Sequence, residues 1–116
     1  MIGEIWTYKA TKPSDNIEKV RPVLVIGDDK ENGLKFIDIN YVIISSSASC
    51  GKYDVLIKEN RALEIGLTKE SVIKTTKIYT GTQTKLGRKV CDLPQDIKEE
   101  FKNKYKEYQK SIIENL

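Results

Sequence analysis

Hydrophobic and polar positions in the first part of the chain follow the two-residue period of β-strands. Residues 3–8 alternate in this way, and residues 23–26 form a short apolar, mostly β-branched run. Residues 34–47 are β-rich and become apolar on both faces towards their end, which is typical of a central strand. The pattern therefore predicts three strands here, with Asn32-Gly33 as the strongest turn signal between the second and the third.

The middle of the chain predicts further short strands, interrupted by polar residues. We expect residues 53–57 to form a strand that pairs with the preceding one, and residues 59–66 to be connecting material. Thr68 is a plausible N-cap for one short helical turn. The remaining β-prone segments are residues 71–76, 78–80 and 86–91.

The period changes to that of a helix after Pro94, a residue that favours the first turn of a helix. Apolar side chains then recur at intervals of four, four, three, four and four residues, at Ile97, Phe101, Tyr105, Tyr108, Ile112 and Leu116. This stripe predicts one amphipathic helix of roughly five turns with a solvated Lys- and Glu-rich face. The whole pattern indicates a mainly β fold with α: a small, strongly curved antiparallel sheet or barrel with a long C-terminal helix against it.

Composition indicates one globular domain over residues 1–116. Hydrophobic residues make up 39% and charged residues 32% of the chain, and the apolar runs are far too short for a membrane span. No signal peptide is evident at the N-terminus. Cys50 and Cys91 lack metal-ligand spacing, so they are either one disulfide or, more economically, two reduced thiols of a cytoplasmic protein.

Charge and residue types narrow the possible chemistry. A net charge of +3 is only mildly basic and does not by itself indicate a nucleic-acid partner. The chain has no histidine, which excludes His-based acid–base chemistry, His-assisted nucleophiles and imidazole metal sites. Catalysis would have to use carboxylates, hydroxyls, Lys, Arg, Tyr or Cys.

Arg21 is the first candidate functional residue. Because Pro22 has no N–H, we expect it at the first residue of its strand, where it also forces Arg21 into an extended conformation. Residues 9–19 form a polar segment before it that reads as a long loop. The arrangement suits a guanidinium that binds a phosphate or carboxylate; the alternative is a surface arginine in a local ion pair.

A cluster of serines, residues 45–47 and 49, follows the third predicted strand. Hydroxyl and backbone donors at a strand end can bind an oxyanion, although such a cluster is also ordinary loop composition. The serines are therefore a second candidate site.

Three ordered pieces resemble one known family over nearly the whole chain. They are Gly3-Glu4-Ile5-Trp6, Arg21-Pro22-Val23-Leu24-Val25-Ile26 and Ile44-Ser45-Ser46. Together the pieces resemble the PemK/MazF family of toxin endoribonucleases. The resemblance implies an SH3-like barrel with a C-terminal helix, usually a homodimer, that cuts single-stranded RNA without a metal or cofactor and is neutralised by a cognate antitoxin.

Carried over by position, Arg21 matches the family's active-site arginine, and Ser45 matches its Thr/Ser at the strand end, with Ser46 as the alternate register. In such cleavage the ribose 2′-OH attacks, and Arg and Ser donors stabilise the phosphorane. Glu18 is the candidate general base. Residues expected to contact RNA are Lys19, Ser46, Ser47 and Asp15, the last also an alternative base.

Two functions follow from these observations. The first is a sequence-selective endoribonuclease toxin. The second is a catalytically weak or inactive barrel of the same fold that binds protein or nucleic acid. It stays open because the segment before Arg21 has no glycine and has Asn16 where the family usually carries an acid.

Overall fold

The computed structural model describes residues 1–11 and 18–116, and the side chains of all of these except Thr11 and Glu18. Within these residues, six strands form one antiparallel sheet in the order β4-β5-β3-β2-β1-β6. The strands are β1 Glu4–Thr11, β2 Glu18–Asp28, β3 Asp38–Ser45, β4 Val55–Ile57, β5 Ser71–Thr82 and β6 Leu86–Asp92. The helices are α1 Glu59–Glu64, the short 3-10 helix η1 Gln83–Lys85 and α2 Gln95–Asn115.

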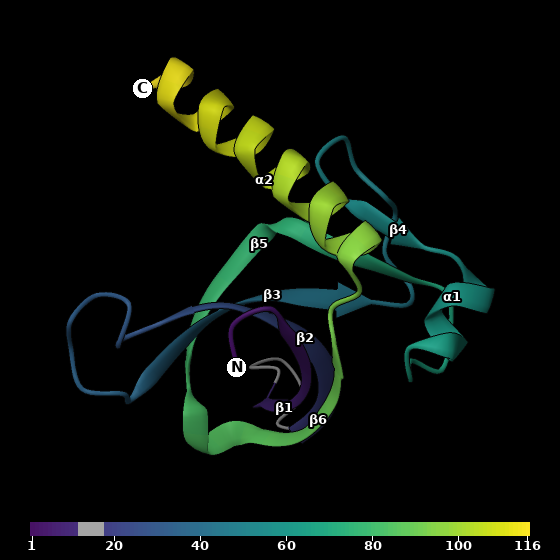
Figure 1. Cartoon of the computed structure of the whole chain (residues 1–116), viewed down its shortest axis with the longest axis horizontal. Coiled ribbons are helices and arrows are strands. Elements are labelled where there is room, and N and C mark those ends of the chain that lie inside the picture. The colour runs from purple at the N-terminus through teal and green to yellow at the C-terminus, as the bar shows by residue number, and fades with distance from the viewer. Residues whose placement is uncertain (12–17) are drawn as a thin grey trace.

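The sheet curls into a half-barrel, and α2 lies across one side of it (Figure 1). The predicted class, a mainly β fold with a curved antiparallel sheet and a long C-terminal helix, is confirmed. β3 lies between β2 and β5, as the two apolar faces of its sequence predicted for a central strand. The predicted last strand and the helix after Pro94 are also present.

The polar segment 9–19 is not the long loop that we expected. Its two ends continue β1 and β2 as a paired ribbon, with Lys9 opposite Val20 and Ala10 opposite Lys19. Ladder hydrogen bonds are made by the backbone, so this pairing does not require apolar side chains. Lys9 and Lys19 are accordingly paired through their backbones while their side chains remain exposed.

Pro22 lies in the middle of β2, opposite Thr7 of β1, and the expectation that it would begin the strand is wrong. The ladder between β2 and β3 reaches only to the pair of Val23 with Ile43. Pro22, which has no N–H, lies beyond this last pair and therefore interrupts no hydrogen bond between β2 and β3. Arg21 is extended, as predicted, and lies opposite Tyr8.

Residues 53–57 do not pair with β3. The shorter β4 pairs with β5 instead, because β2 and β5 already occupy both edges of β3. The predicted segments 71–76 and 78–80 are one continuous strand, β5, and the expected connection 59–66 contains α1. Thr68 begins no helical turn.

Residues 34–37 also differ from the prediction, because β3 begins only at Asp38. A compact turn precedes it, in which Leu34 N–H donates to the carbonyl of Asp29 and Gly33 adopts a φ of 72°. That left-handed conformation favours glycine, which explains why Asn32-Gly33 was a reliable turn signal. The turn leaves Leu34 and Ile37 exposed rather than paired.

Alternate residues of the strands build two separate apolar clusters on opposite faces of the sheet. Leu24 belongs to the cluster between the sheet and the helices, whereas Val23 and Val25 belong to the other. The second cluster contains Tyr8 and Tyr41, whose ring centroids lie 4.7 Å apart. Burial raises the pKa of Tyr41 to about 12, so this phenol stays neutral at physiological pH.

α2 packs on the first cluster through only part of its apolar stripe. Ile97 and Phe101 are buried, whereas Ile112 and Leu116 at the far end are exposed. Figure 1 shows this end of the helix projecting past the sheet. No helix among the described residues is long and apolar enough to cross a membrane.

A buried ion pair holds the segment between β3 and β4. Asp54, whose side chain is 4% exposed, accepts from Lys74 Nζ at 2.7 Å and from Gly51 N–H at 2.8 Å through the same oxygen. Its other oxygen accepts from Thr75 N–H at 3.2 Å. Lys74 Nζ also donates to the carbonyl of Ser49 at 3.0 Å. Two points of this segment are therefore tied to β5.

Replacing Asp54 with alanine should lower the free energy of unfolding by about 3 kcal/mol, because the Lys74 ammonium loses its charge partner and the N–H groups of Gly51 and Thr75 lose their acceptor. Urea denaturation measures this change. Glu64→Gln is the control: it breaks an exposed ion pair with Arg61 and should change the free energy by less than about 0.5 kcal/mol. Equal effects of the two substitutions would contradict the role given to Asp54.

A second carboxylate links β1 to β6. Glu4 accepts from the Trp6 indole N–H at 2.8 Å and pairs with Lys89 Nζ at 3.1 Å. The indole hydrogen bond, followed by that of Lys89, lowers the pKa of Glu4. A carboxyl group with a lowered pKa in the folded state stabilises the fold at neutral pH, and this contribution is lost as the pH falls through the folded-state pKa.

The stability difference between the wild type and Glu4→Gln should therefore shrink as the pH falls from about 7 to about 3. Urea midpoints measured across this range test the prediction. The control is the stability difference between the wild type and Glu64→Gln over the same pH range, because Glu64 is a carboxylate in an exposed ion pair. If the wild type became more stable relative to Glu4→Gln as the pH falls, the pKa of Glu4 would not be lowered by folding, and the prediction would be wrong.

Candidate functional site

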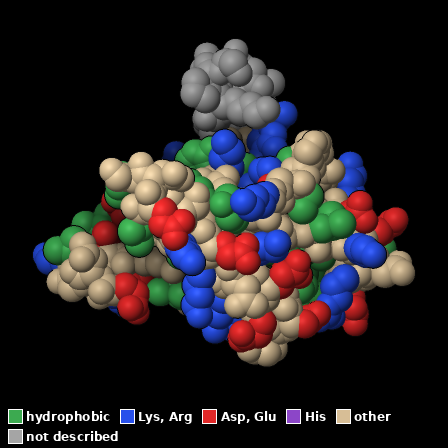
Figure 2. Space-filling view, turned by 90° about the horizontal axis from the view of Figure 1, so that it is seen from above, with side chains coloured by type: hydrophobic (Ala, Val, Ile, Leu, Met, Phe, Trp, Pro, Cys, Tyr) green, Lys and Arg blue, Asp and Glu red, His purple; other side chains and the backbone are tan. Residues whose placement is uncertain are grey.

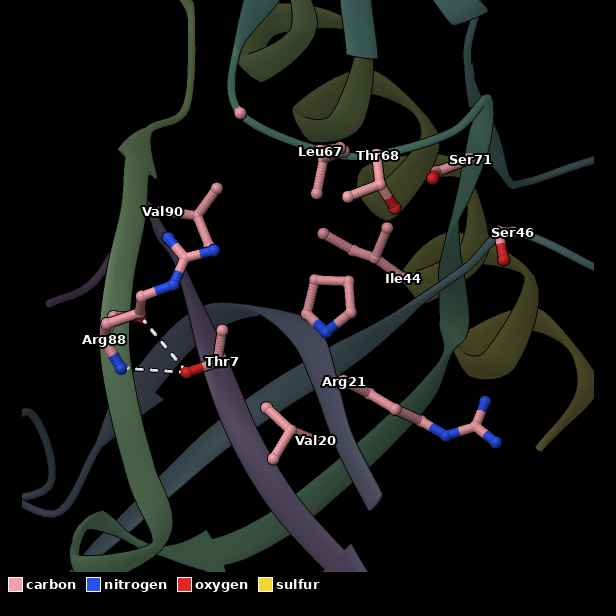
Figure 3. A pocket seen from close by; sticks show the side chains of 12 residues that line it. Thr7, Val20, Arg21, Ile44, Ser46, Leu67, Thr68, Ser71, Arg88 and Val90 are labelled. Carbon is pink, nitrogen blue, oxygen red and sulfur yellow. Dashed lines mark hydrogen bonds between the residues drawn. The ribbon is translucent and has the colours of Figure 1, made fainter. Parts of the chain in front are cut away.

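A cavity of about 410 Å³ lies where the ladder between β2 and β3 ends. Its walls come from five strands, β1, β2, β3, β5 and β6, from the segment that joins α1 to β5, and from Ser46 just after β3. The lining residues are Thr7, Val20, Arg21, Pro22, Ile44, Ser46, Gly66, Leu67, Thr68, Ser71, Arg88 and Val90. Figure 3 shows Ile44 and Leu67 between Arg21 and Arg88, which lie on opposite sides, and Val90 beside Arg88. The site thus combines an apolar floor with two separated guanidinium groups.

Arg21 lines this cavity, as expected of a functional arginine. The last pair of the β2–β3 ladder joins Val23 to Ile43, so Arg21 and Ser45 each lie two residues beyond that pair on neighbouring strands. The Arg21 side chain is half-buried, and it lies on the same side of the cavity as Ser46 (Figure 3). Arg21 and one member of the serine cluster, Ser46, therefore line the same cavity.

The three serines at the end of β3 have different positions. Ser45 Oγ accepts from the backbone N–H groups of Ser47 and Ala48 at 3.3 and 3.2 Å, which is a local turn motif. Ser46 lines the cavity and is exposed, whereas Ser45 and Ser47 are not among the lining residues. The alternate register is thus the one whose hydroxyl reaches the cavity, and Ser45 holds the turn.

The other predicted site residues are less closely tied to the cavity. Lys19 is exposed and does not line it. Glu18 begins β2 opposite Thr11, but its side chain lies outside the described part of the structure. Asp15 lies outside the described residues altogether.

Several lining residues were missed by the sequence analysis: Thr7, Thr68, Ser71 and Arg88. Ser71 is buried, and its hydroxyl donates to the carbonyl of Lys69 at 2.9 Å. Thr7 Oγ1 accepts from Arg88 N–H at 2.8 Å. For Arg88 a signal existed, because a glycine within a strand, here Gly87, often marks a bulge that redirects a neighbouring side chain.

Positive charge at this site is local rather than spread over the surface. Neither Arg21 nor Arg88 forms an ion pair with a described carboxylate. Figure 2 shows basic and acidic side chains interspersed over the face seen from above, in keeping with the small net charge of +3. In residues 1–11 and 18–116, no three Cys, Asp or Glu side chains form a group that could hold a metal ion.

Comparison with known proteins identifies a family for the chain. A family model described as a PemK-like, MazF-like toxin of type II toxin-antitoxin systems matches residues 2–108. No curated protein sequence matches. The toxin MazF-mt6 of Mycobacterium tuberculosis is a similar solved structure, with 17% identity, a TM-score of 0.64, and coverage of 86% of this chain and 91% of that one.

Two further similar solved structures are described as complexes of two proteins. A MazE–MazF structure from Deinococcus radiodurans has 16% identity, a TM-score of 0.69, and coverage of 93% of this chain and 94% of that one. A mycobacterial endoribonuclease in complex with its cognate antitoxin has 12% identity, a TM-score of 0.66, and coverage of 90% and 89%. At these identities the structures establish a shared fold.

Ser45→Ala and Ser46→Ala should separate the two serines by stability. Ser45→Ala should lower the free energy of unfolding by about 1 kcal/mol, because two backbone N–H groups lose their acceptor. Ser46→Ala should change it by less than about 0.5 kcal/mol, because that side chain is exposed. Urea denaturation of both variants tests this, and the reverse order would mean that the two roles are exchanged.

Proposed function

The chain belongs to the PemK/MazF family of toxins, and from this membership and the geometry of the cavity we propose that it is a metal-independent endoribonuclease. The proposed substrate is single-stranded RNA, including mRNA, cut at a short sequence in the cytoplasm. The observation that carries the proposal is the convergence of Arg21 and Ser46 on one cavity at the end of the β2–β3 ladder. Arg21 is the residue that matches the family's active-site arginine.

In the proposed reaction, the ribose 2′-OH attacks the adjacent phosphorus, the bond to the 5′-oxygen breaks, and a 2′,3′-cyclic phosphate remains. Negative charge gathers on the non-bridging oxygens in the transition state. A guanidinium has several N–H donors in a fixed plane and can bind two such oxygens at once. Arg21 is the proposed donor, and its half-buried position strengthens the interaction with the phosphate.

Ser46 is the proposed second donor. Its hydroxyl borders the cavity, whereas the Ser45 hydroxyl is engaged with the backbone of the turn. Ser45 is then a positioning residue that fixes the backbone on which Ser46 is carried. Ser47 donates its N–H to Ser45, so its proposed contribution to RNA binding is indirect.

The proton transfers require a base and an acid other than histidine, because the chain has none. Glu18 is the proposed general base, since it begins the strand that carries Arg21. Lys19 and Asp15 are proposed to contact the RNA beyond the cavity. These three assignments rest on sequence position and on the chemistry of the residue types.

The proposed partners follow from the family. One similar structure is described as an endoribonuclease in complex with its cognate antitoxin and another as MazE–MazF. We propose that a cognate antitoxin neutralises this chain and that the active form is a homodimer. Growth after induced expression gives a simple check. An active toxin should arrest growth unless its antitoxin is co-expressed, and Arg21→Ala should relieve the arrest.

The central experiment is cleavage of a long unstructured RNA in EDTA by the wild type and Arg21→Ala. We expect the wild type to cut at a short recurrent sequence and to leave 2′,3′-cyclic phosphates. Arg21→Ala should be slower by at least about 10²-fold, because it lacks the guanidinium at the developing charge. Arg21→Lys should restore little of the activity, because an ammonium cannot bind two oxygens in one plane.

Folding of each variant is checked by circular dichroism, so that loss of activity is not loss of structure. A wild type that binds RNA or a partner but does not cut would overturn the nuclease proposal. The protein would then be a binding module of the same fold, the function left open by the absence of the family's glycines and acid before Arg21. Cleavage by Arg21→Ala at the wild-type rate would remove Arg21 from the mechanism.

A further inference from the structure

The pairing of β1 with β6 contains an irregularity next to the cavity. Trp6 lies opposite Lys89 and Tyr8 lies opposite Leu86, so the single residue Thr7 faces both Gly87 and Arg88. Two residues opposite one define a β-bulge, which bends its strand and changes the direction of a side chain. Bulges of this kind often lie beside functional sites.

Side-chain packing fixes this bulge. Thr7 Oγ1 accepts from Arg88 N–H at 2.8 Å, in place of a regular ladder bond. A Cβ atom at position 87 would collide with the same hydroxyl, so the arrangement requires glycine there. The backbone of Arg88 is thus held in one position although its side chain is exposed.

The two neighbouring basic residues of β6 differ in their environment. Lys89 pairs with Glu4 at 3.1 Å and with Asp92 at 2.9 Å, so its charge is compensated. Arg88 pairs with no described carboxylate, and its side chain lies at the cavity, across the apolar floor from Arg21 (Figure 3). An arginine with a restrained backbone and a guanidinium that is not paired with a described carboxylate is suited to bind the anion of a ligand.

We propose that Arg88 binds a second phosphate of the RNA, one linkage away from the phosphate that Arg21 binds. This inference rests on the proposed function. Single-stranded RNA presents one phosphate per nucleotide. The apolar side chains of Ile44 and Leu67 between the two arginines, with Val90 beside Arg88, would lie under the nucleoside that joins the two phosphates. Arg88 would then set the position of the strand relative to Arg21.

The test uses a short oligoribonucleotide centred on the mapped cut site, with a 2′-deoxy substitution there that prevents cleavage. Fluorescence anisotropy should show that Arg88→Ala weakens binding about ten-fold. The slope of log affinity against log salt should fall in magnitude by about 0.7, as expected for one lost contact to a single strand. Lys106→Ala, which removes one exposed positive charge from α2, should change both quantities little.

A steady-state cleavage assay separates binding of a remote phosphate from chemistry. Arg88→Ala should raise KM with little change in kcat, whereas Arg21→Ala should lower kcat. Arg88→Lys should recover part of the affinity, because it keeps the charge without the planar donors. A fall in kcat with unchanged KM for Arg88→Ala would overturn the proposed role.

A scan with single neutral methylphosphonate linkages identifies the phosphate. The wild type should lose about ten-fold in affinity when the linkage beside the cut site is neutral, and Arg88→Ala should lose no more at that linkage. Equal losses by both proteins at every linkage, or wild-type binding by Arg88→Ala, would overturn the inference while leaving the nuclease intact. If the wild type neither binds nor cuts RNA, the proposed function itself fails, and this inference fails with it.

Discussion

Pro22 ends the pairing of β2 with β3, and the candidate site depends on that ending. A proline has no N–H to donate, so β3 is not paired with β2 beyond the pair of Val23 with Ile43. β1 still pairs with β2 from Ile5 opposite Leu24 to Thr11 opposite Glu18, so Pro22 and Arg21 are paired on this side. At Arg21 and Pro22 the strand β2 is therefore paired on one side only, and both residues line the cavity.

Much of the fold could be predicted because its signals are local. The apolar run of residues 23–26, the Asn32-Gly33 turn and the helical stripe after Pro94 each specify their own element. The errors concern choices made between distant segments. β4 pairs with β5 because both edges of β3 are occupied, and nothing within residues 53–57 encodes that fact. The polar ends of β1 and β2 pair through their backbones, which hydrophobic patterning does not detect.

The features of the site can likewise be separated into those with a local signal in the sequence and those that depend on contacts between distant segments. The position of Arg21 beside a cavity could be expected from its motif, but which serine lines that cavity and which one bonds the turn backbone depends on the turn geometry. Arg88 lies far from Arg21 in the sequence and reaches the cavity only because β6 pairs with β1 at the edge of the sheet. The bulge that directs it depends on Thr7, a residue whose sequence context reads as an ordinary strand position.

Each proposed functional side chain is positioned through its backbone. Pro22 restrains Arg21, the Thr7 hydroxyl and Gly87 restrain Arg88, and Ser45 restrains the turn that carries Ser46. The Asp54–Lys74 pair then fixes that turn's far end to β5. Restraint of this kind limits where the side chains can move, and among the described residues neither Arg21 nor Arg88 is paired with a carboxylate. A protein with a small net charge can thereby concentrate positive potential at one cavity, so that binding depends on where the phosphates of a ligand lie and not on their number alone.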